Sequence, residues 1–194
     1  MGYCGAIRTY EQARLHHIAC VHNNRMLGLT PQESAMIRSA RASDREHICL
    51  LSEQINRDHH KNMPGDFRQP DGKGDWEHWV AFLNDERGIF LVAEVDGEIL
   101  GFVACKVVES GKISFLVQKT KLQISTVVVK ERVQRKGIGR QLLEAALDEG
   151  AARGATEAFL EVMSYNKNAH EFYEMLGFSS FSEKMSLQLA KPNQ

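Results

Sequence analysis

The chain has 194 residues, of which 43% are hydrophobic and 25% charged, a composition typical of an ordinary globular protein. Its 24 basic residues nearly balance 25 acidic ones, and the formal net charge of -1 excludes a global basic field for nucleic acid or an anionic membrane. The 4 cysteines form no CxxC pair, so we expect no zinc site and reduced thiols in a cytosol.

The two ends of the chain carry no targeting signal that we can identify. No apolar run approaches the ~20 residues of a membrane span, and the N-terminus lacks the basic start and apolar core of a secretory signal. We therefore predict a soluble, cytoplasmic protein with neither nucleic acid nor a membrane as partner. Residues 1–33 show weak periodicity and are expected to form an N-terminal extension. The folded domain is expected over residues 34–194.

The first part of this domain predicts a short strand followed by two helices. Alternation around Met36 favours the strand, and Ser43 with Glu46 has the capping-box spacing that begins a helix. Residues 56–75 are rich in Gly, Pro, Asp and Asn, which is typical of a loop. Asp75 is the expected cap of a second helix over residues 76–85.

The second part predicts strands on both sides of two further helices. Residues 89–108 form two β-rich runs around Asp96-Gly97, the signal of a two-residue hairpin turn. The remaining elements are expected as a strand at 121–129, a helix at 140–152, a strand at 156–164, a helix at 166–176 and one or two strands within 179–189. This order predicts an α/β protein with a mixed sheet.

The turn VQRKGIG, residues 133–139, lies between a predicted strand and a predicted helix. Backbone N–H groups at a helix N-terminus lack intrahelical partners, and the helix dipole is positive there. Gly137 and Gly139 allow an anion to approach the backbone, while Arg135, Lys136 and Arg140 add positive charge. The spacing matches neither a Walker loop nor the dinucleotide fingerprint. A phosphate cradle and an ordinary glycine turn both remain open from these residues alone.

Two blocks of the sequence resemble the GNAT acetyltransferase superfamily. Gln134, Gly137 and Gly139 match its acetyl-CoA loop, and residues 160–178 match a second block through Glu161, Asn166, Ala169, Tyr173 and Gly177-Phe178. The hairpin turn and the early Arg38, Ala40 and Asp44 also fit, so the resemblance covers residues 34–189. It implies a GNAT fold, with a mostly antiparallel sheet of about six to seven strands flanked by about four helices.

The resemblance also implies how coenzyme A would be held. The pyrophosphate would sit on backbone N–H groups of the turn, and the pantetheine arm would pair like an added strand with the end of the preceding strand. Asn166 is expected to cap a helix and to bond the cofactor arm. The implied cofactor-binding residues are Val127, Val128, Val129, Gln134, Arg135, Lys136, Gly137, Ile138, Gly139, Arg140, Asn166 and Tyr173.

The expected chemistry needs a proton acceptor and a proton donor. An attacking alkyl amine must lose a proton, because its ammonium form titrates near ~10.4. Some family members carry a catalytic glutamate at the position of Gln123, which cannot accept a proton. The resemblance therefore shifts the role of base to Glu161, where related enzymes use a glutamate, or to an ordered water. An ordinary strand carboxylate remains the alternative for Glu161. Tyr173 matches the family tyrosine that protonates the departing sulfur, with a core aromatic as the alternative.

In the family, the acceptor pocket is built from the first helices, their connecting loop and the later strands, and here that loop is expected within residues 57–79. Its acidic and aromatic residues would suit a cationic amine, and no metal site is expected there. We predict an N-acetyltransferase acting on a primary amine of a small molecule, as a monomer or homodimer. A peptide or protein acceptor, and a coenzyme A-binding regulatory module without turnover, remain the alternatives.

Overall fold

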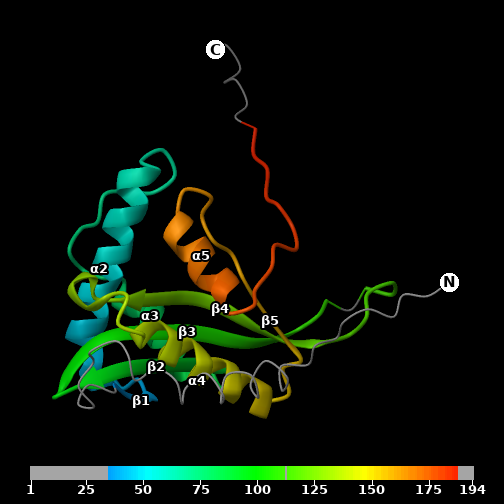
Figure 1. Cartoon of the computed structure of the whole chain (residues 1–194), viewed down its shortest axis with the longest axis horizontal. Helices are drawn as coiled ribbons and strands as arrows, with labels where there is room; N and C mark the ends of the chain where they lie inside the picture. The colour runs from blue at the N-terminus through cyan, green and yellow to red at the C-terminus, as the bar shows by residue number, and fades with distance from the viewer. Residues whose placement is uncertain (1–34, 112, 188–194) are drawn as a thin grey trace, which may run out of the picture. The chain divides into compact units, whose positions relative to one another are not determined.

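The computed structural model describes residues 35–111 and 113–187, and Figure 1 shows the arrangement of its elements. The strands are β1 (Met36–Ser39), β2 (Gly88–Val95), β3 (Glu98–Glu109), β4 (Thr120–Val129) and β5 (Glu157–Leu160). The α-helices are α2 (Arg45–Asn62), α3 (Trp76–Asn84), α4 (Ile138–Ala152) and α5 (Lys167–Met175), and single 3-10 turns are η1 (Ala42–Asp44) and η2 (Glu131–Val133). The expected extension at residues 1–33 lies outside the described residues.

The strands form one mixed sheet in the order β1-β2-β3-β4-β5. The first three junctions are antiparallel and β4 pairs with β5 in parallel, which confirms the expected mixed, mostly antiparallel α/β fold. Asp96 and Gly97 both adopt positive φ at the β2–β3 turn, at 50° and 81°. This is the geometry of a type I′ hairpin turn, which confirms the expected hairpin.

The described sheet has 5 strands rather than six to seven, because the expected strand within residues 179–189 does not form over its described part. Residues 179–187 have no regular structure, and residues 188–189 lie outside the described residues. Phe181 is 98% exposed, Met185 90% and Leu187 83%. The alternating pattern is present in the sequence, but no neighbouring strand covers its apolar side in this structure.

The start of α2 also differs from the expected capping box. Asp44, not Ser43, is the N-cap residue, and its carboxylate accepts from Arg41 N at 2.8 Å. Arg38 holds both oxygens of Asp44, at 2.8 and 2.9 Å, and also binds Glu94 at 2.6 Å. Because this arginine–carboxylate contact is bidentate and largely buried, it fixes the end of β1 to the start of α2.

Each face of the sheet has its own hydrophobic core. One core joins alternate strand residues such as Val103 and Cys105 to α4 and α5, through residues such as Leu142 and Leu143, with Phe172 and Tyr173 packed against it. The other joins the intervening strand residues to α2 and α3, including Ile48, Trp79 and Phe102. The sheet therefore separates an α4–α5 face from an α2–α3 face, and Figure 1 shows α4 lying across the first of them.

Gly101 in β3 offers a test of this packing next to the end of β4. A Cβ atom at Gly101 would lie 2.6 Å from the carbonyl oxygen of Val128 and 3.2 Å from Leu142 Cδ1. We expect Gly101→Ala to lower the free energy of unfolding by about 1–3 kcal/mol, because the close atom is backbone and cannot move aside. Urea denaturation measures the change. Gly65→Ala is the control, since nothing lies within 4 Å of its added Cβ, and an equal loss there would contradict the steric explanation.

Candidate active site

The parallel pair β4–β5 opens after a few residues. Lys121–Ile124 pair with Glu157–Leu160, and β5 then ends. At the same level the β3–β4 register shifts: Cys105 pairs with Ile124 but Ala104 pairs with Thr126, so Ser125 is an extra residue. Such a β-bulge bends a strand and increases its twist. We call the space beside β4 beyond Ser125 the gap; here β4 continues without β5 as a neighbour.

The bulge determines which backbone groups of β4 face the gap. Lys130 N donates to Leu100 O at 2.8 Å, and the carbonyl oxygen of Val128 lies against Gly101, so these two residues face β3. Because successive residues of a strand alternate, the N–H and C=O groups of Val127 and Val129 point into the gap. Within the described residues no strand pairs with these groups on this side, so an extended amide-bearing chain can add here.

The turn before α4 has the backbone shape of an anion-binding loop. Arg135 and Gly137 adopt positive φ, at 63° and 87°, with Lys136 at negative φ between them. Alternation of this kind turns successive N–H groups toward one point. The α4 ladder begins where Gln141 N donates to Gly137 O at 3.1 Å, so the N–H groups of Ile138 and Gly139 precede it. These groups, at the positive end of the helix dipole, fit a phosphate.

The side chains of this turn differ in their roles. Arg135 and Lys136 are exposed, so their charged groups are available to a ligand. Gln134 is also exposed, but its amide nitrogen donates to Val129 O at 3.0 Å. Ile138 is buried in the α4–α5 core, which leaves only its backbone for binding. A Cβ at Gly139 would meet Val129 Cγ2 at 3.5 Å and Phe172 Cζ at 3.6 Å, so this glycine lies between the end of β4 and α5. The turn, the end of β4 and α5 thus meet at one place.

Tyr173 lies on the α4–α5 face, in contact with Phe172 and Phe178 at ring-centroid distances of 5.2 and 5.7 Å. Burial raises the pKa of its phenol to about 12, and the nearby Cys105 thiol contributes to the rise. Cys105 pairs with Ile124 directly before the bulge. The phenol therefore keeps its proton at neutral pH and lies on the part of the sheet where the gap begins.

Glu161 does not lie within a strand as expected. β5 ends at Leu160, and Glu161 is exposed at the first position after it. The strand stops here because β4 bends away at Ser125 and leaves no partner for a longer β5. Gln123, at the position where some family members have a glutamate, pairs with Phe159 and is exposed. Glu161 is thus placed at the mouth of the gap.

Asn166 is the N-cap of α5, as expected. Its side-chain oxygen accepts from Ala169 N at 3.0 Å. The cap fixes where the chain leaves the β5–α5 loop and enters the helix that carries Tyr173. A lost cap of this kind costs about 1 kcal/mol of helix stability.

Sequence reasoning missed Gln54 of α2, which contacts the end of β4. Gln54 Nε2 donates to Val129 O at 3.0 Å, and Gln134 Nε2 donates to the same oxygen at 3.0 Å. Gln54 Oε1 also accepts from Glu131 N at 3.2 Å. These contacts join α2 to the gap-facing edge of β4, and their separation of 75 residues along the chain leaves no local signal.

A second missed contact joins α2 to the β5–α5 loop. The Tyr165 hydroxyl donates to Asp58 Oδ2 at 3.0 Å and lies 2.6 Å from His59 Nδ1. The hydroxyl has only one proton, and Asp58 accepts it. In the second contact the Tyr165 oxygen is therefore the acceptor, and His59 donates its Nδ1–H. Burial and Asp58 raise the pKa of Tyr165 to about 12, and burial lowers the pKa of His59. We call these three residues the α2–loop cluster.

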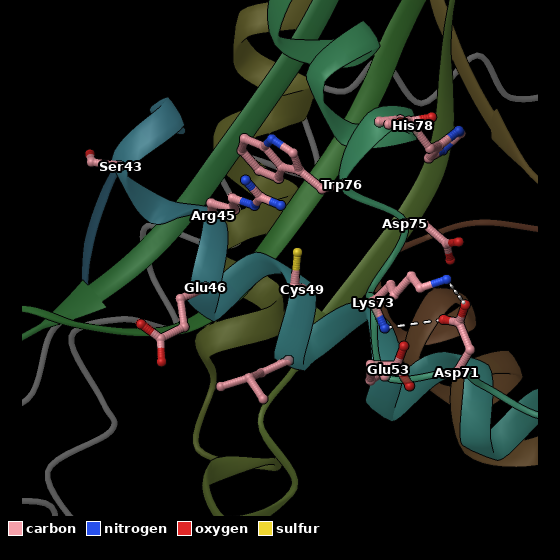
Figure 2. Close-up of a pocket in the computed structure, with 13 residues that line it drawn as sticks. Ser43, Arg45, Glu46, Cys49, Glu53, Asp71, Lys73, Asp75, Trp76 and His78 are labelled. Carbon is pink, nitrogen blue, oxygen red and sulfur yellow. Dashed lines mark hydrogen bonds and ion pairs between the residues drawn. The ribbon is translucent and has the colours of Figure 1, made fainter.

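The expected acceptor loop is divided between two places. Asp58 and His59 lie in α2 and join the α2–loop cluster, beside a cavity of about 240 Å³ lined by Asp58, Asn62, Tyr165, Asn166, Lys167 and Asn168. The residues from Asp71 to His78 instead line a groove of about 1260 Å³ between α2 and α3. Figure 2 shows this groove, with Lys73 paired to Asp71 and Arg45 beside Trp76. The larger groove therefore lies away from the β4 edge.

Neither region contains a metal site. Within residues 35–111 and 113–187, no group of three or more His, Cys, Asp and Glu side chains is arranged to hold a metal ion. Among the same residues, no helix is both long and apolar enough to cross a bilayer.

The model of the acetyltransferase (GNAT) family matches residues 53–178, and the chain belongs to this family. The match includes the second half of α2, the bulged β4, the turn before α4 and the whole of the second block. It confirms the family resemblance drawn from Gln134, Gly137, Gly139 and residues 160–178.

The names of the curated relatives indicate different acceptors. An N-alpha-acetyltransferase from Sulfurisphaera tokodaii is 34% identical over 106 residues, covering 52% of this chain and 62% of that protein. A streptothricin acetyltransferase from Streptomyces lavendulae is 30% identical over 109 residues, covering 56% of this chain and 53% of that protein. The chain thus spans about half the length of the curated relatives that it matches.

Among solved structures, a mutant of the BH1408 protein from Bacillus halodurans has a TM-score of 0.76 and 26% sequence identity to this chain. The likeness covers 80% of this chain and 99% of that one. The described fold therefore agrees with an experimentally determined structure over nearly the whole length of that structure.

The α2–loop cluster predicts a pH dependence of stability. The pKa of His59 in the folded chain lies below its ordinary value of about 6.5, so the unfolded chain binds more protons as the pH falls through that value. We expect the free energy of unfolding to decrease from pH 7 toward pH 5, and His59→Gln to reduce this decrease. Urea denaturation at a series of pH values measures it, and an unchanged slope in the variant would contradict the assignment.

Proposed function

We propose that this chain is an acetyl-CoA-dependent N-acetyltransferase that moves an acetyl group to a primary amine of a small molecule by direct attack on the thioester. The observation that carries the proposal is that two binding features, the edge of β4 and the turn before α4, lie next to each other beside the gap. The edge of Val127 and Val129, with which no described strand pairs, can bind an extended amide chain, and the turn before α4 can bind a phosphate. Coenzyme A contains both an extended amide-bearing arm and a pyrophosphate. We assign the activity to residues 34–194 and treat residues 1–33 as an extension.

The cofactor would be held by backbone groups in both regions. The N–H groups from Gln134 to Arg140 would bind the pyrophosphate, and the side chains of Arg135, Lys136 and Arg140 would add positive charge nearby. Backbone groups of Val127 and Val129 would pair with the amide-bearing arm, next to Val128. Asn166, whose side-chain oxygen caps α5, would use its amide N–H groups to bond the cofactor arm.

Acetyl-CoA supplies an activated thioester, and the chain would supply proton donors, proton acceptors and positioning. Tyr173 would donate its phenolic proton to the departing sulfur as the carbon–sulfur bond breaks, and its raised pKa means that the phenol still carries this proton at neutral pH. Glu161 would accept a proton from the attacking amine, directly or through a water molecule, as the carbon–nitrogen bond forms. Gln123 cannot fill this role because its side chain has no basic site at neutral pH.

A small cationic acceptor is favoured by the cavity beside the α2–loop cluster. Its volume of about 240 Å³ is small, and the Asp58 carboxylate lines it. An amine with a second positive charge would place that charge near Asp58 and its reacting amine toward the gap. The relative named streptothricin acetyltransferase is consistent with a small-molecule acceptor.

A peptide acceptor is the second candidate, because another relative of similar identity is named N-alpha-acetyltransferase. An assay of coenzyme A thiol release with a panel of small amines and short peptides distinguishes the two. We expect turnover with small di- and polyamines to exceed turnover with peptides. Faster reaction of peptides would replace the small-molecule proposal, and binding of acetyl-CoA without turnover of any acceptor would indicate a regulatory module.

The phosphate cradle can be tested at Gly137. Gly137→Val places a β-branched side chain at φ 87° in the turn and should disrupt the arrangement of its N–H groups. Gly154→Val is the matched control, because Gly154 has φ 88° at the other end of α4 with nothing within 4 Å of its added Cβ. Calorimetry should show a large loss of acetyl-CoA affinity only for Gly137→Val. Equal affinities in two folded variants would contradict the cradle.

The proposed acid and base can be tested separately. Tyr173→Phe removes one hydroxyl and keeps the ring packing, so we expect kcat to fall about 10²-fold, at the low end for general acid catalysis.

Glu161→Gln should flatten the acidic limb of the pH–rate profile. If both variants keep near wild-type kcat with a good acceptor, proximity alone would account for the rate and both roles would be wrong.

A further inference from the structure

The side-chain amide of Gln54 takes a place on β4 that a residue of a neighbouring strand would take. In a parallel ladder, one residue donates to a carbonyl of its neighbour and accepts from the N–H two residues further along. Gln54 makes this pair of contacts, because its Nε2 donates to Val129 O at 3.0 Å and its Oε1 accepts from Glu131 N at 3.2 Å. Lys130, between them, is turned toward β3. One primary amide thus pairs here as a backbone amide would.

The edge of β4 has another place of the same kind beside it. The C=O of Val127 and the N–H of Val129 both point into the gap and lie two residues apart. No described strand pairs with them on this side. A ligand amide can donate to Val127 O and accept from Val129 N, in the pattern that Gln54 repeats one step further along. The edge therefore has two consecutive amide places, and Gln54 fills the one nearer the turn before α4.

We propose that Gln54 is a positioning residue that fixes the register of the coenzyme A arm along β4. This role rests on the proposed function, because it concerns the same edge and the same cofactor. With the next place filled, an amide of the arm can pair only at Val127 O and Val129 N. The pyrophosphate end of the arm lies toward the turn before α4, so the sulfur end lies toward the bulge at Ser125. This is the part of the sheet where Tyr173 lies.

Two anchored contacts hold Gln54 in place on α2. Three residues before it, Leu51 is buried in the α2–α3 core, which also contains Val128 of β4. Four residues after it, Asp58 accepts from the Tyr165 hydroxyl at 3.0 Å. Residues three and four apart are neighbours on a helix surface, so both contacts fix the side of α2 that carries Gln54. Its amide is therefore held at one height along the strand.

Gln54→Leu tests this role, because it keeps a similar side-chain volume and removes both hydrogen bonds. The second amide place then opens to the arm. We expect calorimetry to show coenzyme A binding about 2- to 10-fold tighter, the effect of about one net hydrogen bond. We also expect kcat to fall by up to about 10²-fold, because an arm that pairs one place further along moves the thioester roughly 6.6 Å, or two strand residues.

Glu46→Gln is the matched control, because Glu46 is an exposed residue of the same helix and lines the groove between α2 and α3. This control should keep both the coenzyme A affinity and kcat. If Gln54 only joins α2 to β4, its loss would weaken coenzyme A binding or leave it unchanged, and either result would overturn the proposal. Tighter binding with an unchanged kcat would overturn it as well, since the register would then not depend on Gln54.

The wild-type chain gives a second measurement that does not depend on how Gln54→Leu folds. The side-chain NH₂ protons of Gln54, followed by NMR, should keep the slow hydrogen exchange of a bonded amide when coenzyme A is added. Fast exchange in the complex would show that the arm displaces Gln54 from Val129 O, and the proposal would be wrong. A chain that binds no coenzyme A at all would instead refute the proposed function, and this role would fall with it.

Discussion

The extra residue at Ser125 is the constraint on which the arrangement of the site depends. Without it, β4 would stay parallel to β5 and its edge groups would be used in the sheet. With it, β4 turns away, β5 ends at Leu160, and the edge at Val127 and Val129 remains open beside the start of α4. The bulge also places Gln123 before the gap and Val129 beyond it. A single local irregularity therefore creates both the space and the polar lining of the site.

The parts of the fold that were predictable from sequence are those whose causes are local. Asp96 and Gly97 form the expected turn because few residues tolerate two successive positive φ angles. Gly137 was identified because a glycine before a helix lets an anion approach the backbone, and the structure adds that this residue is left-handed, with φ 87°. Asn166 caps α5 through an acceptor–donor pair only three residues apart. In each case the determining atoms lie within one turn of chain.

The parts that sequence did not predict depend on residues far apart in the chain. Tyr165 is hydrogen-bonded to Asp58, which lies 107 positions earlier in the chain, and the sequence pattern of neither segment indicates this contact. The length of β5 was overestimated because residues 161–164 look like a strand, while the bend of β4 that ends the pairing lies in another segment. The loop expected at residues 56–75 is not one unit, because α2 extends to Asn62 and Asp58 lines a different cavity from Asp71 and Asp75.

The two glutamines on Val129 O have a consequence for the energetics of any ligand that pairs with this edge. Gln54 and Gln134 already satisfy that carbonyl, each at 3.0 Å. A ligand amide that takes this oxygen exchanges one hydrogen bond for another, and a typical net bond contributes only about 0.5–1.5 kcal/mol. Pairing with β4 would therefore select the shape of a ligand more than it would strengthen binding. Tight association would have to come from ligand groups that Gln54 and Gln134 do not replace, above all a negative charge placed at the N-terminus of α4.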